Sequence, residues 1–198
     1  MQSWAAHLAS PEPHDHLVQF YGTDDSLLVR NVAAFCGAGL EAGEGVVVVA
    51  TPAHADALLV QLRDAGHDVP AVLGFGRLRL MNAGRTLETV LKAGVPDWEL
   101  LQAAMAGPLA EARRASVAGK ARAFGEMVGI LWERGERASA LRLEAYWDRL
   151  LAGAGVPLFC AYPVDLVGDA DDPAGLDAVI AAHTHTCAGP RTLISNTP

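Results

Sequence analysis

The side chains with the greatest scope for chemistry in this chain stand directly after short apolar runs. The first run ends in Tyr21 and a turn that holds Asp24 and Asp25, and a later run is followed by Glu126. Carboxylates, imidazoles, amides and hydroxyls at such positions can orient a small ligand or exchange a proton with it. Each also has a structural explanation, as a helix cap, a surface residue or a turn former. The candidates of this kind are Tyr21, Asp24, Asp25, His54, Asn82, Glu126 and Tyr162.

A second group of candidates extends from Glu126 along the sequence. Arg142 and Glu144 lie in the helical stretches that follow it, which predicts a buried or half-buried polar network between a strand and those helices. This network would be either a structural ion pair between Glu126 and Arg142 or a clamp for a ligand. Trp132 and Trp147 flank it, so they would either form the apolar wall of a pocket or fill the core.

The turn after the first strand has the position of a phosphate-binding loop but not its composition. Such a loop has the spacing GxxxxGK followed by Ser or Thr, so that backbone amides and the lysine contact phosphates. The sequence here, YGTDDSLLV, has one glycine and no lysine. Asp24 and Asp25 stand where phosphates would lie, and like charges repel strongly in a low-dielectric cleft. We therefore predict that the loop excludes phosphate and that no nucleotide cofactor binds.

Signatures of other active sites are absent from the sequence. GxSxG, CxxC, HExxH and GxGxxG do not occur, so no catalytic residue is predicted. His7, His14 and His16 are irregularly spaced, which favours solvated surface histidines over a metal site. The run HTHTC at 183–187 lacks a second ligand group at a suitable spacing and is interpreted as a frayed helix end. Cys160, inside an apolar strand, is interpreted as an inert packed thiol, and no metal is predicted.

Alternating strands and helices must position these candidates. Residues 16–54 predict a short strand, an amphipathic helix over 26–40 and a second strand over 46–50 that is apolar at every position. A strand without alternation is covered on both faces, as in parallel sheets with helices above and below. We predict a three-layer α/β fold with a mostly parallel sheet. Its strands are expected near 17–21, 46–50, 77–82, 121–126 and 156–162, with the interval 87–119 entirely helical.

The carboxyl edge of that sheet is where a ligand is expected, because loops and helix N-termini meet there. The strand-end side chains should therefore converge on one concavity, with a tryptophan contributing an apolar wall. The residues in this expectation are Tyr21, His54, Asn82, Glu126 and Tyr162, with Trp132 or Trp147.

Length and composition limit the classes of function. With 198 residues, 51% of them hydrophobic, the chain can bury one substantial core. We predict a flexible lead over 1–15, a single domain over 16–186 and a polar tail over 187–198. The net charge of −8 argues against a nucleic-acid or anionic-membrane partner. No run could span a bilayer, and three cysteines without a disulfide pattern predict reduced thiols, so a cytoplasmic location is expected.

Several segments together resemble one known family. They are HLVQFY followed by Asp24 and Asp25, GLEAGEGVVVVATPAH, FGEMVGILWERGERASALRLEAYWDRL and FCAYP. Over residues 14–186 the chain resembles the MEDS domain, the methanogen/methylotroph sensory domain of DcmR-type regulators, which implies a sensory or regulatory module. That family in turn resembles RecA/KaiC-like ATPases, in which a GE turn precedes the apolar second strand, as at 43–44 here. The lack of a phosphate loop, and the Thr-Pro pair at 51–52 in place of an acid, imply a degenerate core.

Our leading hypothesis is a non-catalytic module that binds an unknown small molecule and signals through a regulatory protein partner. One alternative is a residual nucleotide-binding or phosphotransfer enzyme that uses His54 or Glu126. Another is a protein-interaction domain without a ligand. Formation of a homo-oligomer is left open.

Overall fold

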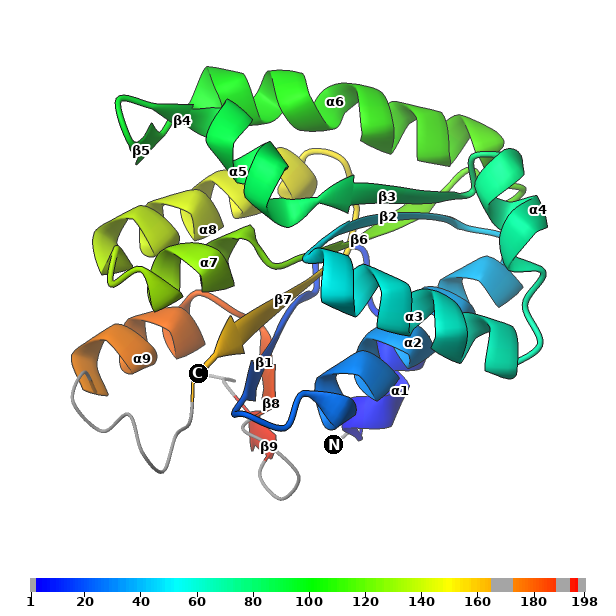
Figure 1. Ribbon diagram of the computed structural model, residues 1–198, viewed down its shortest axis with the longest axis horizontal. Helices are drawn as coiled ribbons and strands as arrows, with labels where there is room; N and C mark the ends of the chain where they lie inside the picture. Colours follow the sequence, from blue (N-terminus) through cyan, green and yellow to red (C-terminus); the bar gives the residue numbers. More distant parts are fainter. Residues whose placement is uncertain (1–2, 165–172, 188–192, 196–198) are drawn as a thin grey trace.

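A seven-stranded sheet lies between two helical layers in the computed structural model, which describes residues 3–164, 173–187 and 193–195 (Figure 1). The helices are α1 (Trp4–Ala9), α2 (Ser26–Glu41), α3 (Pro52–Asp64), α4 (Val69–Gly74), α5 (Ala83–Val90), α6 (Trp98–Ala115), α7 (Met127–Glu133), α8 (Arg137–Ala152) and α9 (Pro173–Ala181). The strands of the sheet are β1 (His16–Tyr21), β2 (Gly45–Ala50), β3 (Leu78–Asn82), β6 (Ala121–Gly125), β7 (Leu158–Pro163), β8 (His185–Cys187) and β9 (Leu193–Ser195).

The strand order across the sheet is β3-β2-β6-β7-β1-β8-β9. All neighbouring pairs are parallel except β8 with β9, which are antiparallel. The predicted α/β class, the mostly parallel sheet and the five predicted strands are therefore confirmed. Every residue of β1, β2, β6 and β7 is buried except the last residue of β1 and of β7, as expected of strands covered on both faces.

Each face of the sheet carries its own hydrophobic core because successive strand residues point to opposite faces. Leu17 packs with α1 to α4, whereas Val18 and Phe20 pack with α5 to α9. The crossovers after β1 and β2 run along the first face, and those after β3, β6 and β7 run along the second (Figure 1). The neighbouring strands β2 and β6 thus send their following helices to opposite faces. Such a switch point is where ligands bind in open α/β sheets.

A short hairpin interrupts the interval that was predicted to be entirely helical. Strands β4 (Leu91–Lys92) and β5 (Val95–Pro96) pair antiparallel around a two-residue turn. Ala93 and Gly94 have φ values of 52° and 81°, and two left-handed residues in succession suit a tight hairpin. The prediction was wrong here because apolar spacing does not report a turn that two residues can make. Beyond the hairpin, α6 runs through Pro108 without a break.

The two ends of the chain hold more regular structure than predicted. Within the segment predicted as a flexible lead, α1 buries Leu8 and sets Trp4 edge-on to Phe159 at 5.8 Å. The segment predicted as a frayed helix end instead forms β8, which pairs with β1, and β9 lies within the predicted tail. Tertiary contacts stabilise these short elements, which have little propensity of their own. Among the described helices, none combines the length and apolarity that crossing a membrane requires.

Candidate functional site

Four predicted candidates meet at the carboxyl edge of the sheet, where β1, β2 and β6 end. One carboxylate oxygen of Glu126 accepts a hydrogen bond from the Thr51 amide at 2.6 Å, and the other pairs with Nδ1 of His54. Nε2 of His54 lies 3.0 Å from Oδ2 of Asp25. The ring of Tyr21 stands edge-on to the imidazole, with 5.8 Å between ring centroids. The imidazole is thus held between two carboxylates.

Local structure explains this placement. The register of β2 and β6 pairs Val49 with Gly125, and the Glu126 amide bonds to the Val49 carbonyl at 3.0 Å. Glu126 and Thr51 therefore stand side by side just beyond the paired strands. The Thr51 hydroxyl caps α3 by accepting the amide of His54 at 3.4 Å, with proline at the first helical position. This cap directs the first turn of α3 towards Glu126.

Electrostatics at this edge favour a protonated imidazole. The hydrogen bond to Glu126 raises the pKa of His54 to about 9, burial opposes this effect, and Asp25 adds to it. Burial, and then the charge of Glu126, raises the pKa of the Tyr21 hydroxyl, which stays protonated. At neutral pH the edge therefore presents one imidazolium between two carboxylates, so it favours a hydrogen-bond donor or a cation over an anion.

A small apolar hollow adjoins the His54–Glu126 pair. Its volume is about 10 Å³, which is room for roughly one water molecule. His54 and Glu126 supply its polar groups, and the rest of its wall is apolar and comes from α2, α3, β2 and β6. The full lining consists of Leu28, Val29, Val32, Val48, Ala50, His54, Leu58, Phe124 and Glu126.

The imidazolium of His54 should make stability depend on pH. Because its pKa is about 9 when folded and 6.5 in the reference state, its contribution is complete below pH 6.5 and is lost as the pH rises through about 9. We expect the free energy of unfolding of the wild type to exceed that of His54→Gln by about 2 kcal/mol at about pH 6, allowing for the exposure of Asp25. The difference should vanish above the folded pKa. Urea denaturation of both proteins from acid to alkaline pH would test this, and a constant difference would contradict it.

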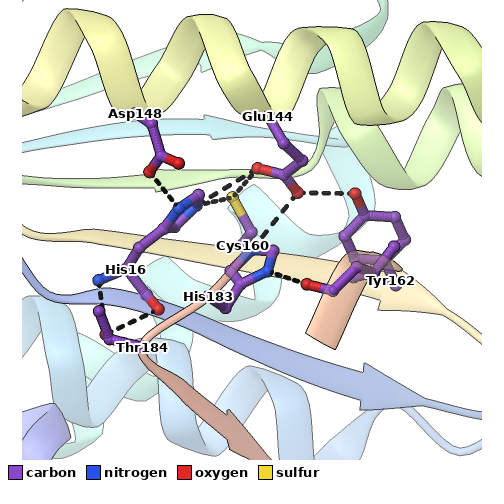
Figure 2. Close-up of polar contacts among 8 residues, drawn as sticks. His16, Glu144, Asp148, Cys160, Tyr162, His183 and Thr184 are labelled. Carbon is purple, nitrogen blue, oxygen red and sulfur yellow. Dashed lines mark hydrogen bonds and ion pairs between the residues drawn. The ribbon is translucent and has the colours of Figure 1, made fainter. Parts of the chain in front are cut away.

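A second polar cluster is buried between β1, β7 and α8, and Figure 2 shows its side chains turned towards one another. Glu144 of α8, with a side chain 1% exposed, accepts a hydrogen bond from the Tyr162 hydroxyl at 2.6 Å. Its Oε2 lies 3.3 Å from Nε2 of His16, and its Oε1 lies 3.4 Å from Nε2 of His183. Sγ of Cys160 lies 3.4 Å from the same His16 nitrogen and 3.5 Å from Glu144 Oε2.

Outer contacts hold both imidazoles of this cluster in place. Nδ1 of His16 lies 2.7 Å from Asp148 Oδ1, and Nδ1 of His183 lies 2.6 Å from the Val179 carbonyl oxygen. Since carboxylate and carbonyl oxygens only accept, each Nδ1 donates. The Thr184 hydroxyl accepts from the His16 amide and donates to the His16 carbonyl, at 2.9 and 3.0 Å. Both rings therefore turn Nε2 towards Glu144 (Figure 2).

The protonation states in the cluster follow from burial and proximity. Burial disfavours a charged His16, but its bonds to Asp148 and Glu144 prevail and raise its pKa to about 9. Burial also disfavours a charged Glu144, yet His183 and His16 hold its pKa below the usual range. Burial, and then Glu144, raises the pKa of the Cys160 thiol well above its usual value. The folded protein itself thus contains a buried carboxylate beside an imidazolium and a neutral thiol.

The family model for the MEthanogen/methylotroph, DcmR Sensory domain matches residues 15–184, a span that contains both clusters. The chain belongs to the MEDS family. The resemblance to the MEDS domain that was stated from the sequence is confirmed. The family is one of sensory domains. No curated protein matches the chain.

The MEDS domain brings some of the predicted site residues together and separates others. Tyr21, Asp25, His54 and Glu126 form the cluster at the carboxyl edge. Asp24 is exposed and accepts the Ser26 amide at 3.0 Å, which lowers its carboxyl pKa. Asn82 lies at the same edge, paired with Ala50, but its side chain caps α5 by accepting the Arg85 amide at 2.9 Å.

Tyr162 and the two tryptophan candidates lie across the sheet from the hollow. Tyr162 points to the α8 layer because it shares the face of Cys160, two residues earlier in β7. Trp132 stands edge-on to Tyr162 at 5.4 Å, and Trp147 is 1% exposed. Both tryptophans fill core, which is one of the two roles that the sequence left open. The predicted convergence of Tyr162 with Glu126 therefore does not occur.

An ion pair between Glu126 and Arg142, one of the two roles that the sequence left open, does not form. Among the described residues, Glu126 bonds to His54 and the Thr51 amide, whereas Arg142 is exposed. Residues two apart on a helix face different directions, so α8 can bury Glu144 only by turning Arg142 outward. A buried polar network does exist in this region of the sequence, but Glu144 is its centre.

The sequence prediction missed three members of the buried cluster. His16 and His183 are each 4% exposed, not solvated or on a frayed end, and Cys160 has polar neighbours. The sequence did indicate that His16 is buried. Alternate residues of a strand point to the same face, so His16 lies on the same face as the apolar Val18 and Phe20. The sequence around His183 carries no such signal, since Glu144, its partner in the cluster, comes from a helix far away in the chain.

Proposed function

We propose that this MEDS domain is a non-catalytic sensory module that binds a small molecule in the hollow at the carboxyl edge of its sheet. The observation that supports this most is the composition of the hollow, with apolar walls and one polar corner made by His54 and Glu126. A ligand with an apolar body and a hydrogen-bond donor suits such a site. The two carboxylates disfavour an anion.

Ligand binding would change the arrangement of helices. A volume of about 10 Å³ is too small for a molecule of several heavy atoms, so binding must widen the space between α2 and α3. Asp25 at the start of α2 and His54 at the start of α3 are joined by their ion pair across this space. Separation of the two helices would stretch that pair, which gives the occupied state a different surface for a regulatory protein partner.

Nuclear magnetic resonance with simple probes would test this proposal. Primary alkanols and alkylammonium ions of about two to six carbons should shift the amide signals of residues around the hollow, and carboxylates of equal length should not. Val29→Phe, which fills the hollow from a half-buried wall, should weaken binding at least about tenfold. Val60→Phe on the exposed face of α3 is the control. Absence of shifts at the hollow, or equal shifts with carboxylates, would overturn the proposal.

A degenerate RecA/KaiC-like core is also part of our proposal, and a residual nucleotide-binding enzyme is the competing one. The proposed loss of phosphate binding is supported by the β1–α2 turn. There the Asp24 carboxylate accepts a hydrogen bond from the Ser26 amide, and Asp25 pairs with His54. These contacts take the positions that phosphate would need at the start of α2.

Nucleotides are accordingly expected to leave thermal stability unchanged. A ligand at about a hundred times its dissociation constant adds about 2.7 kcal/mol, which a melting experiment detects. Millimolar ATP, ADP or GTP with Mg²⁺ should not move the melting temperature. Replacement of Asp24 and Asp25 by asparagine should not confer binding either, because the lysine and glycines are still missing. A clear rise in melting temperature with any nucleotide would favour the enzyme instead.

A further inference from the structure

The buried cluster of the MEDS domain has the composition of a transition-metal site. Four elements each contribute one ligand-type side chain: His16 from β1, Glu144 from α8, Cys160 from β7 and His183 from the segment after α9. All four are buried, and their ligand atoms lie within 4.8 Å of one another. Glu144 is the only acid among them, and the other three side chains are two imidazoles and a thiol.

The spacing of the ligand atoms fits one small ion. Bonds of about 2.0–2.3 Å in tetrahedral geometry place neighbouring ligand atoms about 3.3–3.7 Å apart. The distances here are 3.3 Å from His16 Nε2 to Glu144 Oε2 and 3.4 Å from that nitrogen to Cys160 Sγ. The distance from Glu144 Oε2 to Cys160 Sγ is 3.5 Å, so these three separations match the edges of one face of such a tetrahedron. His183 Nε2 approaches the other oxygen, Glu144 Oε1, at 3.4 Å, which places a fourth ligand atom beside that face.

The outer contacts are those that metal-binding histidines have. Each imidazole donates its Nδ1 proton to a fixed oxygen, on Asp148 for His16 and on the Val179 backbone for His183. Such bonds set the tautomer and direct the Nε2 lone pair to the metal. The Tyr162 hydroxyl similarly holds Glu144 Oε1 at 2.6 Å. With both Nδ1 atoms donating, each Nε2 faces an oxygen of Glu144, so either a proton or a metal ion must lie between them.

A surface cavity borders one residue of the cluster, His16. A cavity of about 100 Å³ opens beside His16 at the amino edge of the sheet, and Asp148 lines it as well. This cavity is separate from the hollow proposed for the small molecule, which lies across the sheet. An ion could therefore reach His16 without disturbance of the carboxyl edge.

We propose that His16, Glu144, Cys160 and His183 bind one Zn²⁺ or similar divalent transition-metal ion. Two imidazoles, a thiolate and one carboxylate suit zinc, whereas Mg²⁺ and Ca²⁺ prefer oxygen ligands. Four protein ligands leave no open position, so the ion ties β1, β7, α8 and the segment between α9 and β8 together and is not catalytic. Binding exchanges the thiol proton and any imidazolium protons for the metal. This site does not depend on the proposed function at the carboxyl edge.

Cobalt substitution in the full chain tests the site directly. Protein stripped with a chelator should bind one equivalent of Co²⁺, with the visible bands of a tetrahedral ion and a thiolate charge-transfer band in the near ultraviolet. Cys160→Ser should abolish the charge-transfer band, and Cys36→Ser, which replaces another buried thiol, should keep it. Elemental analysis and competition with a zinc indicator give stoichiometry and affinity.

A variant outside the ligand set distinguishes loss of metal binding from loss of the folded structure. Asp148→Asn alters an exposed residue that only orients His16, and should lower zinc affinity about 10–100-fold while circular dichroism is unchanged. His67→Gln, remote from the cluster, should leave affinity unchanged. Binding of less than one equivalent, absence of the thiolate band in the wild type, or equal affinity for Asp148→Asn and the wild type would overturn the proposal, and the cluster would then be held by protons alone.

Discussion

Replacement of Glu144 by alanine is expected to lower the free energy of unfolding by about 3–5 kcal/mol, measured by urea denaturation in the presence of a chelator. The carboxylate is 1% exposed and contacts His16, His183 and the Tyr162 hydroxyl. Its removal leaves the Tyr162 hydroxyl without its acceptor and His16 with Asp148 but without its second carboxylate, and it opens a cavity between α8 and β7. The chelator ensures that a bound metal contributes nothing to the measurement.

Two further variants separate the causes of this loss. Arg142→Ala, two residues earlier on the exposed face of α8, should change stability by no more than about 0.5 kcal/mol. Glu144→Gln keeps the size of the side chain and an acceptor for Tyr162, so it should cost less than alanine while still removing the charge. A loss below about 1 kcal/mol for Glu144→Ala would show that the cluster is not a stabilising network.

Arg122→Ala is expected to have an effect of similar size, also about 3–5 kcal/mol. Arg122 of β6 has a side chain 2% exposed and donates from Nε to Glu44 at 2.6 Å. Its Nη1 donates to the carbonyl oxygens of Leu8 and Phe35, at 3.2 and 2.8 Å. The guanidinium thereby joins α1 and α2 to the sheet, and alanine would leave two carbonyls and a carboxylate without their donor.

The geometry of the guanidinium should matter as well as its charge. Arg122→Lys retains the cation but cannot bond in several directions at once, so it should still lose at least about half of the stability that alanine loses. Arg114→Ala, an exposed arginine at the end of α6, is the control. Gly39→Ala should also destabilise, since its Cβ would lie 2.5 Å from Arg122 Nε. Equal stability of Arg122→Lys and the wild type would contradict the role of the hydrogen-bond geometry.

Periodicity determined the layers of this protein. The unbroken apolar run of β2 predicted a strand covered on both faces, and the spacing in α2 predicted a helix against a sheet. Both predictions are local, because a strand or helix pattern depends on neighbours within one or two turns. The sequence did not predict the hairpin of β4 and β5, because two residues with positive φ reverse the chain without altering its apolar content.

Residues that follow parallel strands could be assigned to one edge, but the face on which each lies depends on register. The sequence therefore predicted that Tyr21, His54 and Glu126 meet, since each stands just beyond or at a strand end. It placed Tyr162 with them wrongly, because the alternation along β7 turns that ring to the α8 layer. The pairing of Glu126 with His54, not Arg142, also depended on how α3 and α8 dock.

By itself the sequence determined the α/β class, five of the seven strands of the sheet, the family and the lack of a phosphate loop, because each depends on residues close together in the chain. Only the tertiary structure decided the buried cluster. His16 and His183 are 167 residues apart, and Glu144 and Cys160 belong to a helix and a strand between them. They meet because β1 pairs with both β7 and β8 while α8 covers that pairing. Such a meeting follows from strand order and helix packing, which no local spacing of ligands encodes.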